Sequence, residues 1–312
     1  MKTKKFFFIL YSVCSGTVIF PKLARNGYIR ALWHLTILTF ICSVGFTLGN
    51  IPCLKNDIKK ACSILNQEFG GIAVEKNGIY PRIRRDKEHH IEYQFFQMDY
   101  LPQKTDIDKL KLNTKLCNSG IIWTPESVTG WLKISNDQII LYPVVTNLSD
   151  ATFFSIYPAN RLPNYIRQTP KLACEEPLIL RLCMQGNMPV VGAFLLKSTD
   201  NFDILIPSLV RWSSVIVMFK FFTAAILNML FYGLIFALIY RFTSKNDYMS
   251  YTFKNFFVTA IYASFPAIII GTLLSLAQTQ WLDYSTIFII AFIIYLFFIL
   301  NNLKINIRGS SD

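Results

Sequence analysis

Four apolar runs in this 312-residue chain approach or exceed the length needed to cross a lipid bilayer. A helix rises about 1.5 Å per residue, so about 20 residues cover a hydrocarbon core roughly 30 Å thick. Hydrophobic residues make up 53% of the chain and charged residues 16%, against roughly 25% charged in soluble domains. The sequence therefore predicts an α-helical integral membrane protein with four transmembrane helices, at residues 31–51, 221–240, 256–277 and 285–300.

Basic residues gather in short flanks of these runs and supply most of the net charge of +12. The amino-terminal segment, the loop after the second span and the tail each carry more Lys and Arg than Asp and Glu. In multi-pass proteins such flanks face the cytoplasm. The pattern predicts a cytoplasmic (inner) membrane protein with both termini in the cytoplasm and residues 52–204 outside. This charge pattern is not the one that is typical of a nucleic-acid-binding surface.

The segments between the spans are short, apart from residues 52–204. Residues 1–30 are predicted to be cytoplasmic and interfacial, with a helix over 6–20 lying along the membrane surface. A cleaved signal peptide is the alternative, although no small-x-small cleavage site follows residue 20. We also expect an interfacial or protruding helix at 205–220, a cytoplasmic loop at 241–255, an outer turn at 278–284 and a cytoplasmic tail at 301–312.

Residues 52–204 are long enough to form their own core and are predicted to be an extracytoplasmic α+β domain. Apolar residues at helical spacing directly after the first span indicate a short amphipathic helix. The pair Asn77-Gly78 lies between alternating apolar residues, which predicts a hairpin that turns on these two residues. Further expectations are a strand at 91–95, a hairpin over 131–145 and a helix over 171–185.

Five cysteines fall in this outer segment, where an oxidising compartment would permit disulfides. Cys53 and Cys62 are nine residues apart, and so are Cys174 and Cys183. The spacing suggests these four as disulfide candidates, but connectivity does not follow from one sequence. Simple buried thiols are the alternative. Because the count is odd, at least one thiol would stay reduced or pair between chains.

One cluster has residue types that ligate metals, namely His89, His90 and Glu92. It lacks the His-Glu-x-x-His spacing that places two imidazoles on one helical face. On a strand, His89 and His90 would point to opposite faces. The interpretation is a solvated charged turn, so no metal site and no cofactor are predicted.

Helix packing explains the polar and small residues of the spans. Asn228 lies within the second span, where an amide usually hydrogen-bonds a neighbouring helix. Small residues recur at three- and four-residue steps in the third span, which permits close approach of helices. These packing residues are Ala260, Ser264, Ala267, Gly271 and Ser275.

Several short motifs, taken in order, resemble a known family. They are Phe7-Phe8-Ile9-Leu10-Tyr11-Ser12, Ile72-x-Val74-x-x-Asn77-Gly78, Gly120-Ile-Ile-Trp-Thr124, Gln138-Ile-Ile-Leu-Tyr-Pro143 and the run from Met249 to Pro266. The chain resembles the uncharacterised bacterial inner-membrane family built on domain of unknown function 1189, some members of which are labelled maltodextrin-utilisation proteins. The resemblance implies the topology and a bacterial envelope setting, and it supplies no catalytic residues.

The fit to this family is incomplete. An aspartate–threonine pair of its outer domain has its nearest match at Met98-Asp99-Tyr100, where no threonine follows. The carboxy-terminal helices are also similar, more weakly, to Yip1-like membrane proteins.

The sequence offers few residues or motifs that are typical of enzymatic catalysis. The chain has three histidines and shows no phosphate loop, dinucleotide fingerprint or nucleophile elbow. We expect a non-catalytic accessory or scaffold subunit of an envelope or sugar-uptake system, in contact with the bilayer and with a membrane-protein partner or further copies of itself. A ligand-binding membrane sensor that signals through a partner is the alternative. An envelope enzyme using outer-domain carboxylates is the second alternative.

Overall fold

The chain divides into two compact units. The helical unit comprises Met1–Pro52 and Ser214–Asp312, and the sheet unit comprises Cys53–Ser213. The structure is a computed structural model, and it describes residues 3–93, 96–147, 155–169, 171–181, 193–243, 252–277 and 283–308.

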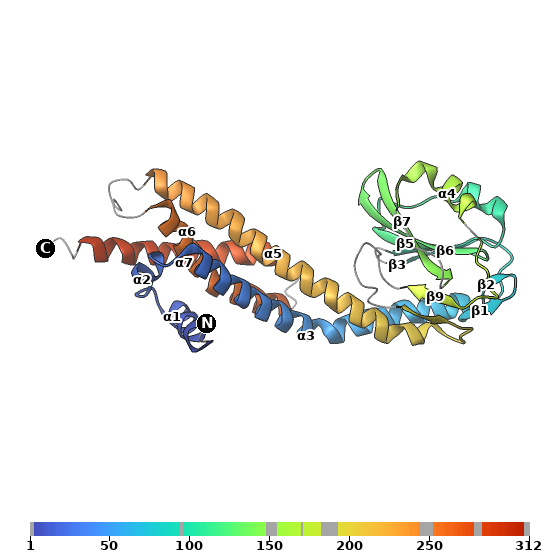
Figure 1. Cartoon of the computed structure of the whole chain (residues 1–312), viewed down its shortest axis with the longest axis horizontal. Coiled ribbons are helices and arrows are strands. Elements are labelled where there is room, and N and C mark those ends of the chain that lie inside the picture. Colours follow the sequence, from blue (N-terminus) through green and yellow to red (C-terminus); the bar gives the residue numbers. More distant parts are fainter. Residues whose placement is uncertain are drawn as a thin grey trace. The chain divides into compact units, whose positions relative to one another are not determined.

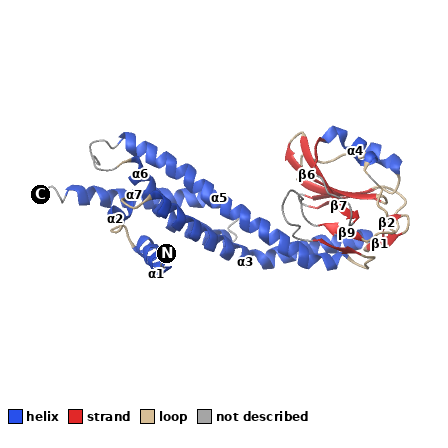
Figure 2. Cartoon of the chain, in the orientation of Figure 1, coloured by secondary structure: helices blue, strands red, loops and turns tan. Residues whose placement is uncertain are grey.

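In the described part of the chain, four helices are long and apolar enough to cross a membrane, as the sequence predicted (Figures 1 and 2). Two shorter helices precede them along the chain. In order, the helices of the amino- and carboxy-terminal parts are α1 (Thr3–Ser15), α2 (Phe20–Ala24), α3 (Tyr28–Phe69), α5 (Ile206–Thr243), α6 (Phe253–Leu276) and α7 (Tyr284–Arg308).

Two predicted helix boundaries are wrong. Helix α3 continues past residue 51 with Pro52 inside it, so the span and the predicted amphipathic helix are one element. A proline inside a helix costs about 3 kcal/mol, yet helical apolar spacing resumes directly after it. Likewise, 205–220 is not a separate helix, because α5 runs unbroken from Ile206 to Thr243. The division between the units therefore falls within these helices.

Helix α6 lies at the centre of the helical core. The small residues predicted to pack it, Ala260, Ser264, Ala267 and Gly271, are buried, and Ser275 is half-buried. A Cβ added to Gly271 would come within 2.9 Å of the Tyr284 ring on α7. The small-residue face is therefore used inside this chain.

The Asn228 amide makes the interhelical contact predicted for it. Its Nδ2 donates to the Ser285 hydroxyl of α7 at 3.0 Å. The contact joins α5 to α7, which makes Asn228 a packing residue of the helical unit.

Most of the sheet unit is one sheet, with the strand order β10-β9-β7-β6-β5-β4-β3 and with β8 paired to the first half of β7. All described pairings are antiparallel except β4 with β5. Its strands are β3 (His89–Tyr93), β4 (Phe96–Tyr100), β5 (Ser119–Thr124), β6 (Ser127–Ser135), β7 (Gln138–Asn147), β8 (Ser155–Pro158), β9 (Leu178–Arg181) and β10 (Ala193–Leu196). The short helices are η1 (Lys104–Lys109), η2 (Ala159–Arg161), α4 (Leu162–Gln168) and η3 (Phe202–Leu205).

A separate hairpin of β1 (Ile72–Glu75) and β2 (Gly78–Pro81) confirms the first predicted hairpin but shifts its turn. Gly78 pairs with Glu75, so Lys76 and Asn77 form the turn. Gly78 still requires glycine, because its φ is 155° and an added Cβ would overlap the Pro125 carbonyl.

The other local predictions had mixed outcomes. The hairpin over 131–145 is confirmed by β6 and β7, and the strand at 91–95 is confirmed over its described part. The helix predicted over 171–185 is wrong where it is described, because β9 occupies its later part and pairs with β7. Gln94, Phe95 and residues 182–185 lie outside the described residues.

A disulfide between Cys53 and Cys62, two of the four candidate cysteines, is excluded by their positions. Both residues lie on α3, and nine residues of helix separate them by about 13 Å along the axis. Disulfide geometry needs Cα atoms within about 7 Å, so these two cysteines cannot be joined to each other. Among the described residues Cys174 forms no disulfide, and Cys183 lies outside them.

Candidate functional site

The alternation of side chains along β3 separates the two neighbouring histidines. His89 points towards α3, where its Nε2 lies 2.7 Å from Glu68 Oε2 and its ring meets the Phe69 ring edge-on. Arg85 binds the same Glu68 carboxylate at 2.8 Å. These contacts make His89 part of the packing between β3 and α3.

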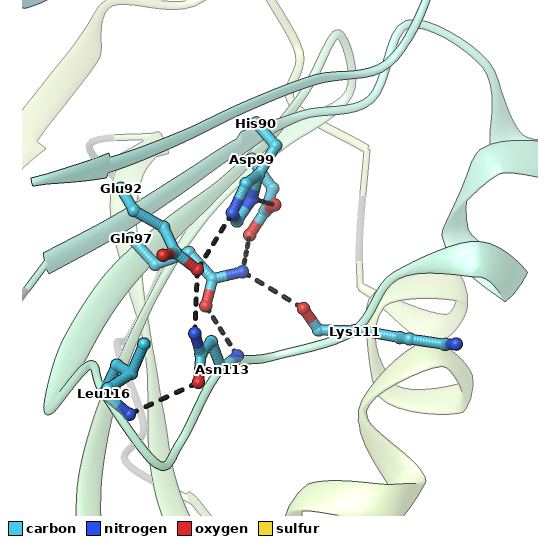
Figure 3. Close-up of polar contacts among 7 residues, drawn as sticks. All are labelled: His90, Glu92, Gln97, Asp99, Lys111, Asn113 and Leu116. Carbon is cyan, nitrogen blue, oxygen red and sulfur yellow. Dashed lines mark hydrogen bonds and ion pairs between the residues drawn. The ribbon is translucent and has the colours of Figure 1, made fainter.

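His90 points the other way and lies between two carboxylates (Figure 3). Its Nδ1 is 2.6 Å from Asp99 Oδ1, and its Nε2 is 3.1 Å from Glu92 Oε1. Asp99 is the direct cross-strand partner of His90 in the β3–β4 register. The interpretation of this segment as a solvated turn is therefore wrong, because His90 and Glu92 belong to a hydrogen-bonded strand.

A buried amide extends the cluster into the chain that follows β4. Gln97 Nε2 donates to Asp99 Oδ2 at 2.8 Å and to the Lys111 carbonyl at 3.1 Å. Gln97 Oε1 accepts from the backbone of Asn113 at 2.8 Å. Since Asp99 and Gln97 are both buried, these hydrogen bonds connect β4 to residues 110–118 in the interior of the sheet unit.

Asn113 closes the network, as Figure 3 shows. Its side-chain amide donates to Glu92 Oε1 at 3.0 Å, and its Oδ1 accepts from the backbone of Leu116 at 3.3 Å. Glu92 Oε1 is thus shared by His90 and Asn113. We define the polar cluster as His90, Glu92, Gln97, Asp99 and Asn113.

The surroundings of His90 favour its protonated form. Burial of the ring opposes protonation, but hydrogen bonds and charge interactions with Asp99 and Glu92 outweigh it and raise the pKa of His90. Burial also raises the pKa of the Asp99 carboxyl, although its hydrogen bonds to His90 and Gln97 act against this. Hydrogen bonds from Asn113 and His90 lower the pKa of the exposed Glu92 carboxyl.

The raised pKa predicts a pH dependence of stability. Below about pH 6.5 His90 is protonated in both the folded and the unfolded chain, so its stabilising contribution is fully present. As the pH rises above that value and through the higher pKa of the folded state, the contribution is lost. The unfolding temperature of the sheet unit should therefore fall across this window.

Thermal unfolding of the full chain, followed by tryptophan fluorescence from pH 5.5 to 9, measures this effect. His90→Gln should flatten the profile, and His89→Gln is the matched control. A profile unchanged by His90→Gln would contradict the assignment.

The cluster holds an imidazole with its Nδ1 oriented by a buried carboxylate, which is an arrangement that can exchange a proton with a bound molecule. A hollow of about 310 Å³ adjoins it, lined among others by Glu88, His90, Asp99 and Lys111. Within the described residues, no group of three His, Cys, Asp or Glu side chains is placed to hold a metal ion. Of the three candidate ligand residues noted in the sequence, His90 and Glu92 lie together and His89 lies apart.

Asp99, Gln97 and Asn113 carry no local sequence signal for this role. Their only hint is the spacing Gln97-x-Asp99, which puts both side chains on one face of a strand. The pairing partner of that strand is what brings His90 to them, and it follows from the sheet register.

A larger hollow of about 650 Å³ lies elsewhere in the sheet unit. It is bordered by η1, α4 and the β5–β6 turn, and the Arg167–Asp108 ion pair lies in its wall. Hydroxyl and amide groups also line it, including Asn77, Gln103 and Ser127. Its volume is within the range of small-molecule sites.

Comparison of the chain with protein-family models, curated proteins and solved structures gave no match.

Proposed function

We propose that this chain is a multi-pass protein of a bacterial cytoplasmic membrane, with both termini in the cytoplasm and residues 52–204 outside it. The observation that carries the proposal is the pair of long helices whose surfaces expose large apolar side chains. On α5 these include Phe231 and Leu238, and on α7 Ile293 and Phe297. Exposure of such apolar surface to water costs roughly 25 cal/mol of free energy per Å², whereas contact with lipid acyl chains avoids this cost.

The orientation has a direct test by thiol labelling of intact cells. Asn136→Cys lies in the exposed β6–β7 turn, and Arg241→Cys lies near the end of α5. A membrane-impermeant maleimide should add label to the first variant and none to the second, relative to the parent chain. Label on Arg241→Cys alone would reverse the orientation.

Within that membrane we propose a non-catalytic role, as an accessory or scaffold subunit of an envelope or sugar-uptake system. The exposed apolar sides of α5 and α7 leave room for helices of a membrane-protein partner or of further copies of the chain. Cross-linking in the membrane, mild detergent extraction and mass spectrometry test this. A stoichiometric membrane partner supports the role, and a chain recovered alone contradicts it.

A ligand-binding sensor that signals through a partner is the second candidate, favoured by the hollow of about 650 Å³. A small polar compound that raises the unfolding temperature of the full chain would identify a ligand. Arg167→Gln should abolish the shift, while Arg161→Gln, an exposed control on η2, should keep it.

An envelope enzyme using outer-domain carboxylates is the remaining alternative, and the pairing of Asp99 with His90 is the observation that favours it. It requires an activity that Asp99→Asn abolishes at a temperature where the variant is still folded.

A further inference from the structure

A cluster of five exposed cations lies at one end of the helical unit. They come from four helices or their flanks: Lys22 and Arg25 at α2, Arg30 in the first turn of α3, Arg241 near the end of α5, and Lys254 at the start of α6. We call this set the basic cluster.

Aromatic contacts between the helix ends bring these cations to the same end. Lys254 Nζ lies 5.8 Å from the centre of the Tyr28 ring, which joins the start of α6 to the start of α3. The Tyr240 and Phe256 rings are 6.1 Å apart, which joins the end of α5 to the start of α6. Phe20 of α2 contacts Tyr295 of α7 at 6.1 Å.

Within the described residues of the helical unit, the basic cluster has no acidic counterpart. In its described residues Asp283 is the only acid. Asp283 precedes Tyr284, which packs on Gly271, and Gly271 is about 25 Å along α6 from Lys254. None of the five cations pairs with a carboxylate in the described part of the chain.

Helix α1 places an apolar aromatic surface in the same part of the unit. One side of α1 packs on the helical core through the buried Phe6 and Val13, and the Tyr295 hydroxyl donates to the Gly16 carbonyl just after the helix. The opposite side exposes Phe7, Phe8 and Tyr11, at 57%, 65% and 72%. Trp33, one turn after Arg30, is also exposed.

From these observations we infer that the basic cluster and the exposed side of α1 form a binding surface for anionic phospholipid in the leaflet that faces this end of the unit. Phosphate groups would contact the cations, and the acyl chains beneath them would contact the α1 aromatics. Uncompensated cations next to interfacial aromatics are complementary to an anionic bilayer surface, where each base strengthens binding about fivefold. This inference rests on the proposed membrane placement and adds a lipid preference to it.

The test uses the full chain in bilayer nanodiscs that contain equal amounts of phosphatidylglycerol and phosphatidylcholine. One of the two lipids carries brominated acyl chains, which quench nearby tryptophans. The signal of Trp33 is the difference between the chain and its Trp33→Phe variant. Brominated phosphatidylglycerol should quench Trp33 more strongly than brominated phosphatidylcholine.

The triple variant Lys22→Gln/Arg25→Gln/Arg30→Gln should lose this preference, which corresponds to a loss of affinity on the order of a hundredfold. The matched control Lys55→Gln/Lys59→Gln/Lys60→Gln removes three exposed cations from the part of α3 that belongs to the sheet unit, and it should keep the preference.

Equal quenching of Trp33 by the two lipids, or a preference that survives in the triple variant, would overturn the lipid surface and leave the membrane placement standing. Absence of quenching by either lipid would instead refute the membrane placement.

Discussion

Replacement of Gly120 by alanine should lower the free energy of unfolding of the sheet unit by about 3 kcal/mol, the upper part of the usual range for overpacking. Gly120 lies in β5, between β4 and β6. An added Cβ would overlap the Gln97 carbonyl and the Trp131 indole. The carbonyl belongs to a paired strand and the indole is fully buried, so neither group has room to move.

The expected change is a fall in unfolding temperature of roughly 6–12 °C for a unit of this size. It can be followed in the full chain by the fluorescence of Trp123 and Trp131, which are both buried in the sheet unit. The substitution should also disturb the polar cluster, because the displaced carbonyl belongs to Gln97.

Gly130→Ala is the matched comparison on the next strand. The three atoms nearest to its added Cβ all belong to the side chain of Tyr142, which is only partly buried, and none of them is backbone. The loss should therefore be clearly smaller than for Gly120→Ala. Equal losses for the two variants would show that backbone crowding at Gly120 does not govern the effect.

Local patterns were sufficient for much of the fold. Hydropathy located the four long helices, because about 20 apolar residues leave few other structures open to a chain. Alternation around Asn136 located the β6–β7 hairpin, since its two strands are neighbours in sequence. The boundaries of two helices were wrong: the first span was expected to end before Pro52 and the second to begin at residue 221, whereas α3 and α5 continue through these positions.

Pairings between distant segments were not readable. The parallel contact of β4 with β5 needs a long crossover through residues 101–118, and nothing in that stretch has the period of a helix. The same contact positions Asn113 beside Gln97. For the candidate site, the sequence therefore indicated His90 and Glu92 and placed His89 on the opposite face of the strand. It did not indicate Gln97, Asp99 and Asn113, which complete the network.

Asp99→Ala should cost about 2 kcal/mol of stability, in the range measured for hydrogen bonds to charged groups, and should lower the pKa of His90. Asp99 is 4% exposed, so its removal takes the acceptor from His90 Nδ1 and leaves one donor of the buried Gln97 amide without a partner. Glu92 remains on the other ring nitrogen, which keeps part of the preference for the protonated form.

Histidine ring resonances of the labelled full chain measure this directly, because there are only 3 histidines to assign. Asp99→Asn removes the charge but keeps an oxygen that can accept from His90 Nδ1, so the pKa of His90 should fall. Its amide nitrogen would face the Gln97 Nε2 donor, so part of the stability is lost as well. Glu92→Gln should lower that pKa with little change in stability, since Glu92 is at the surface. If the pKa of His90 stays the same in Asp99→Asn, the buried carboxylate does not stabilise the protonated imidazole. The polar cluster would then only stabilise the packing of the sheet unit and would have no acid–base role.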